Sequence, residues 1–177
     1  LFDWQVEATD AAVPTGWVLH VLRALCSFVA AYGFAMLFNA GAKASVLAAL
    51  VGALANTGRL VLIDEFHVPW QLAVGLAAVI IGVLAQLFVS RASLSRVALS
   101  VPAVVIMIPG VPLYRALTNL NNQQIDDALS ALFTVLFTIV AIGMGLALSR
   151  MLTDKNWLME SQERVPNLWD YEKEEDA

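Results

Sequence analysis

Long apolar stretches separated by short polar segments set the pattern of this chain. The apolar stretches cover residues 16–38, 44–63, 69–89, 97–117 and 128–149. An α-helix needs about 20 apolar residues to cross the hydrocarbon layer of a bilayer, and each stretch has about that length. The pattern therefore predicts an all-α integral membrane protein with about five transmembrane helices.

The fourth stretch differs from the others because prolines and a glycine interrupt it. It contains Pro102, Pro109, Gly110 and Pro112. Proline removes a backbone N–H and frees a carbonyl one turn earlier, and unpaired backbone groups are costly in hydrocarbon. We therefore expect the fourth helix to be broken at the Pro-Gly-Val-Pro segment. Transporters often build substrate sites from broken helices; the alternative is a kinked helix that binds nothing.

Composition supports a membrane protein and limits its chemistry. The chain is 59% hydrophobic and 14% charged, whereas soluble domains average about 45–50% and 25%. Its net charge of −5 argues against a nucleic-acid partner. With a single cysteine, Cys26, and two separated histidines, we expect no disulfide within the chain, no cofactor, and no metal site unless carboxylates contribute to it.

The basic residues predict an orientation. If the connections alternate between the two sides of the bilayer, residues 1–15, 64–68 and 118–127 share one side, which contains no Lys or Arg. The loop and end residues on the other side include Lys43, Arg91, Arg96, Arg150 and Lys155. Since basic residues concentrate in the cytoplasm, we expect an extracytoplasmic segment 1–15, a five-span domain 16–150 and an acidic cytoplasmic tail 151–177.

Three arginines lie within predicted spans, namely Arg23, Arg59 and Arg115. No carboxylate lies inside a span to neutralise them, and a guanidinium binds a carboxylate as a planar fork. A substrate carboxylate is one candidate partner, and lipid phosphate is the other. Arg23 and the nearby His20 are close to the start of the first span, so we expect both to reach the headgroups.

Small residues form stripes at helical spacing on several spans. In the second span, Gly52 shares a face with Asn56 and Arg59, so these two polar side chains are expected to point into the bundle, with snorkelling as the alternative for Arg59. The stripe of span three is Gly75, Ala78, Gly82 and Gln86, and that of span five is Thr134, Thr138, Ala141, Gly145 and Ser149. Both predict helix packing.

Catalytic patterns are missing from the sequence. It has no phosphate-binding loop, no His-Glu-x-x-His helix and no pair of aspartates within spans. Asp126 and Asp127 are adjacent, so a helix would point them about 100° apart, and we interpret them as caps of the last helix. We therefore do not expect an enzyme.

Three segments together carry a family resemblance: Gly-Phe-Ala-Met-Leu-Phe-Asn ending at Asn39, Gly-Ala-Leu-Ala-Asn-Thr-Gly-Arg ending at Arg59, and Pro-Gly-Val-Pro-Leu-Tyr ending at Tyr114. In this order and spacing they resemble the threonine/serine exporter family, in particular its small subunit or C-terminal half. The resemblance covers about residues 17–150. It carries over Asn39, Arg59, Pro109, Gly110 and Tyr114, whereas family members often have His where this chain has Asn56.

The resemblance implies export of small amino acids such as threonine and serine across the bacterial inner membrane. Some two-part members are associated with dicarboxylates such as succinate. It also implies a partner, because a five-span half works with a second, larger half that has its own extra-membrane region, as part of a homo- or hetero-oligomer.

Two functions follow as hypotheses. In the first, the chain is a transporter subunit: Arg59 and Arg115 attract a substrate carboxylate, Asn56 and Tyr114 orient it, and the broken backbone at Pro109 and Gly110 adds polar groups. Asn39, Gly52, Pro102 and Pro112 are then turn or structural positions. In the second, the chain is a scaffold for the other half and binds no substrate.

Overall fold

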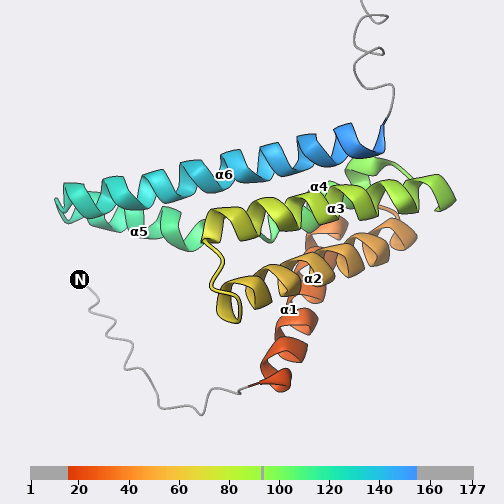
Figure 1. Ribbon diagram of the computed structural model, residues 1–177, viewed down its shortest axis with the longest axis horizontal. Coiled ribbons are helices and arrows are strands. Elements are labelled where there is room, and N and C mark those ends of the chain that lie inside the picture. The colour runs from red at the N-terminus through yellow and green to blue at the C-terminus, as the bar shows by residue number, and fades with distance from the viewer. Residues whose placement is uncertain (1–15, 93, 155–177) are drawn as a thin grey trace, which may run out of the picture.

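The computed structural model describes residues 16–92 and 94–154, which form six helices (Figure 1). They are α1 (Trp17–Leu37), α2 (Ala42–Asp64), α3 (Trp70–Ala92), α4 (Arg96–Val105), α5 (Gly110–Asn121) and α6 (Ile125–Thr153). The predicted extracytoplasmic segment 1–15 and the acidic tail from residue 155 onward lie outside the described residues. The all-α prediction is confirmed for the part that the structure describes.

The helices also confirm the predicted spans. Four helices, α1, α2, α3 and α6, are each long and apolar enough to cross a membrane. The shorter α4 and α5 pass the same test only as a pair, and they are bent by 48° at the break between them. The fourth predicted span is therefore broken, and Pro109 is the residue that precedes α5.

Short local turns close part of the break. The N–H groups of Met107 and Ile108 donate one turn back along the chain at 2.8 and 3.1 Å, and the Gly110 N–H donates to the Ile108 carbonyl at 2.8 Å. The carbonyl oxygens of Ile106 and Met107 accept no hydrogen bond from the described residues. The break therefore leaves two backbone acceptors free, as expected where proline removes donors.

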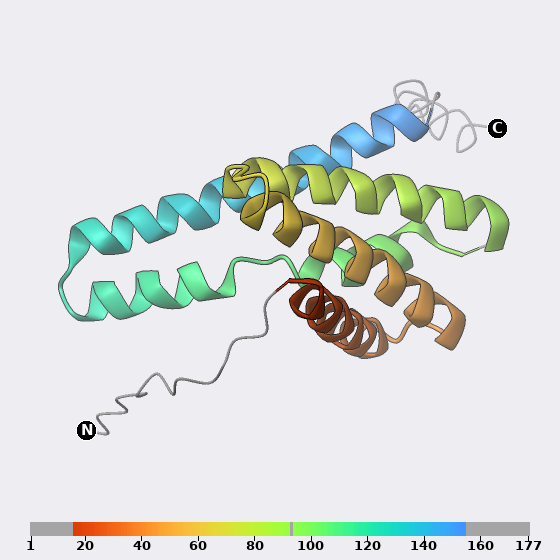
Figure 2. The ribbon, with the colours of Figure 1, turned by 60° about the horizontal axis from the view of Figure 1, so that its bottom comes forward.

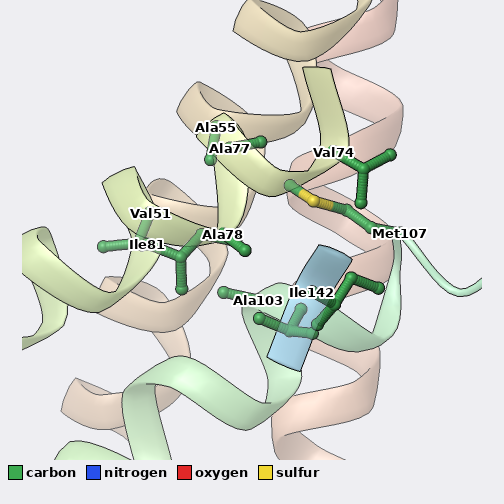
Figure 3. Close-up of a cluster of buried hydrophobic side chains, with 10 residues drawn as sticks. Val51, Ala55, Val74, Ala77, Ala78, Ile81, Ala103, Met107 and Ile142 are labelled. Carbon is green, nitrogen blue, oxygen red and sulfur yellow. The ribbon is translucent and has the colours of Figure 1, made fainter. Parts of the chain in front are cut away.

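The main core joins α2, α3, the end of α4 and α6 (Figure 3). Its buried side chains are Val51, Ala55, Val74, Ala77, Ala78, Ile81, Ala103, Val104, Met107 and Ile142. Met107, in the break itself, is 1% exposed and lies beside Val74 of α3. The core therefore anchors the break against α3.

The small-residue stripes of the third and fifth spans meet each other, which confirms the packing interpretation. A Cβ added at Gly145 would lie 2.5 Å from the Gly75 carbonyl oxygen and 2.8 Å from the Ala78 Cβ. A Cβ added at Gly82 would overlap the Ser149 side chain, 2.5 Å from its Cβ. Glycine is needed at both places because α3 and α6 approach this closely.

Beyond this contact, α5 and the first half of α6 extend away from the other helices (Figures 1 and 2). We call residues 110–137 the α5–α6 arm. Within the arm, α5 packs closely only against α6. The buried residues of the arm are Ala116 and Ala128. Most of its other side chains are exposed.

Arg23 and His20, the two residues expected to reach the headgroups, lie beside the acidic end of the second span. The Arg23 guanidinium pairs with the carboxylate of Asp64, the last residue of α2. Next to this pair, His20 Nε2 lies 3.7 Å from Glu65. The acidic loop after the second span thus supplies partners for the first.

The predicted capping of α6 also differs. Gln124 precedes the helix and makes no side-chain capping bond, while Asp126 and Asp127 lie within the first turn. Their charges are placed near the positive end of the helix dipole. They stabilise the start of the helix through their charges rather than through capping hydrogen bonds.

Candidate functional site

A close contact of α2 determines where its polar residues lie. A Cβ added at Gly52 would lie 3.0 Å from the Ala31 Cβ and 3.2 Å from the Ala103 Cα, so α2 is held tightly between α1 and α4. Because α2 and α4 run in the same direction (Figure 1), the residues one and two turns after Gly52 reach the level of the break after α4. These residues are Asn56 and Arg59.

Asn56 is buried, at 9% exposure. Its Nδ2 donates to the Ser27 hydroxyl of α1 at 2.8 Å, whereas its Oδ1 is buried without a partner. The Asn56 amide therefore joins α1 to α2 through its N–H and still offers its oxygen as an acceptor. The prediction that Asn56 points into the bundle is confirmed.

Arg59 is also inside the bundle, at 7% exposure. Its guanidinium carbon lies 4.7 Å from the centre of the Trp70 ring, at the start of α3. Within residues 16–92 and 94–154, Arg59 forms no ion pair, and its Nε is buried without a hydrogen-bond partner. The snorkelling alternative is therefore not observed. A ring face attracts a cation without cancelling its charge, so this site keeps a net positive charge.

Trp70 is a site residue that the sequence pattern does not reveal. It lies near the start of the third predicted span, its ring covers Arg59 and its own Nε1 is buried without a partner. A signal existed, because a short loop joins α2 to α3 and brings the end of one helix close to the start of the next. Residues near the two ends of such a hairpin are expected to meet.

The residues of the break complete this region. Pro109 is buried, Gly110 is exposed and a Cβ at Gly110 would meet nothing within 4 Å. Pro112 is half-buried in the first turn of α5. The free carbonyl oxygens of Ile106 and Met107 belong to the same segment. We call Asn56, Arg59, Trp70 and the break residues 106–109 the polar cluster.

Tyr114 and Arg115 lie elsewhere. Both are exposed on α5, Tyr114 at 70%, and α5 packs closely on α6 rather than on α2. The structure therefore separates the predicted site into the polar cluster, inside the bundle, and an exposed pair on the α5–α6 arm.

Two turn positions lie toward the opposite end of the helices. Asn39 follows α1 with φ of 56°, a left-handed conformation that asparagine tolerates. Asn39 and the buried Pro102 line a groove of about 360 Å³ beside the start of α4. Among the described residues, no three His, Cys, Asp or Glu side chains gather as a metal site would require.

Comparison with known proteins agrees with this architecture. Residues 23–152 match the family described as threonine/serine exporter, ThrE. A protein of Haemophilus influenzae (strain Rd), named only as uncharacterized, is 29% identical over 136 residues, which cover 72% of this chain and 46% of that protein. The chain thus spans about half the length of this relative. No solved structure matches this chain. Since the family match covers most of the sequence, the chain belongs to the threonine/serine exporter family and is a multi-pass membrane protein.

Proposed function

We propose that this chain is one half of an inner-membrane exporter of small amino acids of the threonine/serine type. The observation that carries the proposal is Arg59, which is buried, lacks a carboxylate partner and lies at the level of a broken helix. A guanidinium in such surroundings gains most from an anion that can accept its planar N–H groups. The carboxylate of a substrate is suited to that position.

The acceptors of the polar cluster favour amino acids over dicarboxylates. Asn56 Oδ1 and the carbonyl oxygens of Ile106 and Met107 are unpaired acceptors, and an ammonium group carries three N–H donors. A second carboxylate would meet these oxygens without a hydrogen bond. We therefore keep succinate-type export as the less supported alternative.

A second half is also part of the proposal. The α5–α6 arm exposes Tyr114 and Arg115 on a helix expected in the membrane, where an arginine facing lipid costs up to about 2.5–3.5 kcal/mol, the value for the centre of a span. The Haemophilus relative has about as much chain again outside the matched region. We propose that a larger partner half with its own extra-membrane region covers the arm, in a complex with the N-terminus outside and the C-terminus inside.

Efflux of labelled substrate tests the function. Vesicles or cells carrying this chain and its partner half would be loaded with threonine, serine or succinate. We expect Arg59→Ala to lower amino-acid efflux at least about tenfold, equivalent to about 1.4 kcal/mol, while the amount of assembled protein stays constant. Arg115→Ala should lower it less, and Arg150→Ala, which changes an exposed arginine at the far end of α6, should have no effect.

The scaffold function gives the opposite result. If this chain only supports its partner, efflux survives Arg59→Ala as long as the complex assembles. A loss of efflux that is accompanied by an equal loss of assembled protein would likewise show that Arg59 is structural.

A further inference from the structure

Trp70 connects two parts of the polar cluster. Its ring covers the Arg59 guanidinium, with 4.7 Å between the guanidinium carbon and the ring centre. The same side chain packs against the buried cluster that contains Met107 of the break. One residue of α3 therefore contacts both the buried arginine of α2 and the core that anchors the break.

We propose that Trp70 is a substrate-binding residue: its ring holds Arg59 in place, and its indole N–H joins the Arg59 Nε–H in donating to one carboxylate of the substrate. The proposal rests on the proposed function and adds a second contact to the same site.

The chemistry of the unpaired atoms supports an oxyanion. Trp70 Nε1 and Arg59 Nε are both buried and both lack a hydrogen-bond partner. Each is a donor only, because neither an indole nor a guanidinium has an acceptor at these atoms. Two neighbouring donors without acceptors fit a carboxylate, which has two oxygens, and they do not fit an ammonium group.

A comparison with Arg23 supports the role of the ring. The same chain pairs Arg23 with Asp64 near the end of the bundle, so a protein carboxylate is the partner there. Inside the bundle, Arg59 has an aromatic ring instead. A ring orients the guanidinium and leaves its charge available, whereas a protein carboxylate would compete with the substrate for the same N–H groups. The ring is therefore suited to an arginine that must bind and release an anion.

Two substitutions separate the ring from the N–H group. Trp70→Phe keeps an aromatic face and loses the donor, while Trp70→Leu loses both. In the complete exporter, we expect Trp70→Phe to raise KM for threonine several-fold with little change in the maximal rate. Trp70→Leu should raise KM further and lower the rate. Trp17→Leu, at a tryptophan that is 75% exposed at the start of α1, is the matched control and should change neither.

A double substitution tests whether the two residues act together. In an Arg59→Gln background, Trp70→Leu should add clearly less to the loss than it does in wild type, because the ring then has no cation to hold and only the N–H contact is removed. If its effect multiplies with that of Arg59→Gln, or if Trp70→Phe and wild type share the same KM, the proposed binding role is wrong.

A second measurement does not depend on transport. Phenylglyoxal modifies accessible arginines, and peptide mass spectrometry reports the modification of Arg59 in the purified chain. Acetate, a simple carboxylate, should slow this modification several-fold in wild type and clearly less in Trp70→Phe, and Trp70→Leu should make Arg59 react faster without acetate. Equal protection by acetate in wild type and Trp70→Phe overturns the proposal. If acetate protects Arg59 as expected but no amino acid is exported, the proposed function fails, whereas carboxylate binding by Arg59 and Trp70 stands.

Discussion

The two halves of α6 have similar apolar sequences and very different surroundings. From Thr138 to Ser149, a residue in every turn is buried, namely Thr138, Ile142, Gly145 and Ser149. From residue 125 to 137, Ala128 alone is buried among the described residues. The second half packs on α3, whereas the first half belongs to the α5–α6 arm and has only α5 beside it (Figure 2).

Residue size explains the difference better than hydrophobicity. Lipid tails are as apolar as leucine, so helices in a bilayer associate where small residues permit close contact. The packed half supplies Gly145 and Ser149, which meet Gly75, Ala78 and Gly82 of α3. The arm instead exposes large side chains, among them Phe133, Leu136 and Phe137. Hydrophobicity places a helix in the membrane, and small residues select its neighbour.

The largest effect is expected from Gly145→Ala in the packed half. A Cβ there would lie 2.5 Å from the Gly75 carbonyl oxygen, which is backbone and cannot rotate away. We expect a loss of about 1–3 kcal/mol in the free energy of unfolding, measured by unfolding in mixed detergent micelles. Gly143→Ala is the control, because its Cβ would meet nothing within 4 Å; alanine should leave stability unchanged or raise it by up to about 1 kcal/mol. Equal effects at the two glycines would contradict the packing described for α3 and α6.

A smaller effect is expected from Ser149→Ala at the end of the same contact. The Ser149 hydroxyl accepts a hydrogen bond from the Arg96 guanidinium at 3.2 Å, and Arg96 also donates to Gln86 at 3.4 Å. Losing one acceptor should lower the free energy of unfolding by about 0.5–1.5 kcal/mol. Ser130→Ala, on the exposed first half of α6, should have no measurable effect in the same assay. A larger loss at Ser130 would mean that this face of the arm is packed against another helix.

The smallest effect on the isolated chain is expected in the arm. Leu136 is 54% exposed, so Leu136→Ala should change the free energy of unfolding by no more than about 0.5 kcal/mol. If the proposed partner half covers the arm, the same substitution should reduce co-purification of the two halves. Leu25→Ala, at a leucine that is 58% exposed on α1, should leave co-purification intact. Equal losses at both leucines would show that the arm has no special part in pairing.

Much of the fold follows from local sequence signals. Apolar length gave the five spans, and prolines located the break, because both depend on how one segment interacts with the bilayer or with its own backbone. The stripes of span three and span five were also predictable, since helical spacing alone shows which residues share a face. Gly82 opposite Ser149 is an example that the structure confirms.

Pairings between helices were harder to predict, because they depend on tilt and register. The partner of Arg23 is an example, because Asp64 comes within its reach only once α1 and α2 pack. The stacking of Arg59 on Trp70 likewise depends on how α2 meets α3. The position of Arg115 relative to Arg59 could not be read from sequence either, because the 48° bend directs α5 away from α2.

The pair of Arg23 and Asp64 has a consequence for biogenesis. While the chain is being synthesised, α1 emerges before the residue that neutralises its arginine, since Asp64 is the last residue of α2. Inserted alone, α1 would carry an unpaired guanidinium into the bilayer, at a cost of up to about 2.5–3.5 kcal/mol, the value for the centre of a span. Insertion of α1 and α2 together, as a helical hairpin, avoids that intermediate. The first step in assembling this membrane domain is therefore expected to involve two helices rather than one.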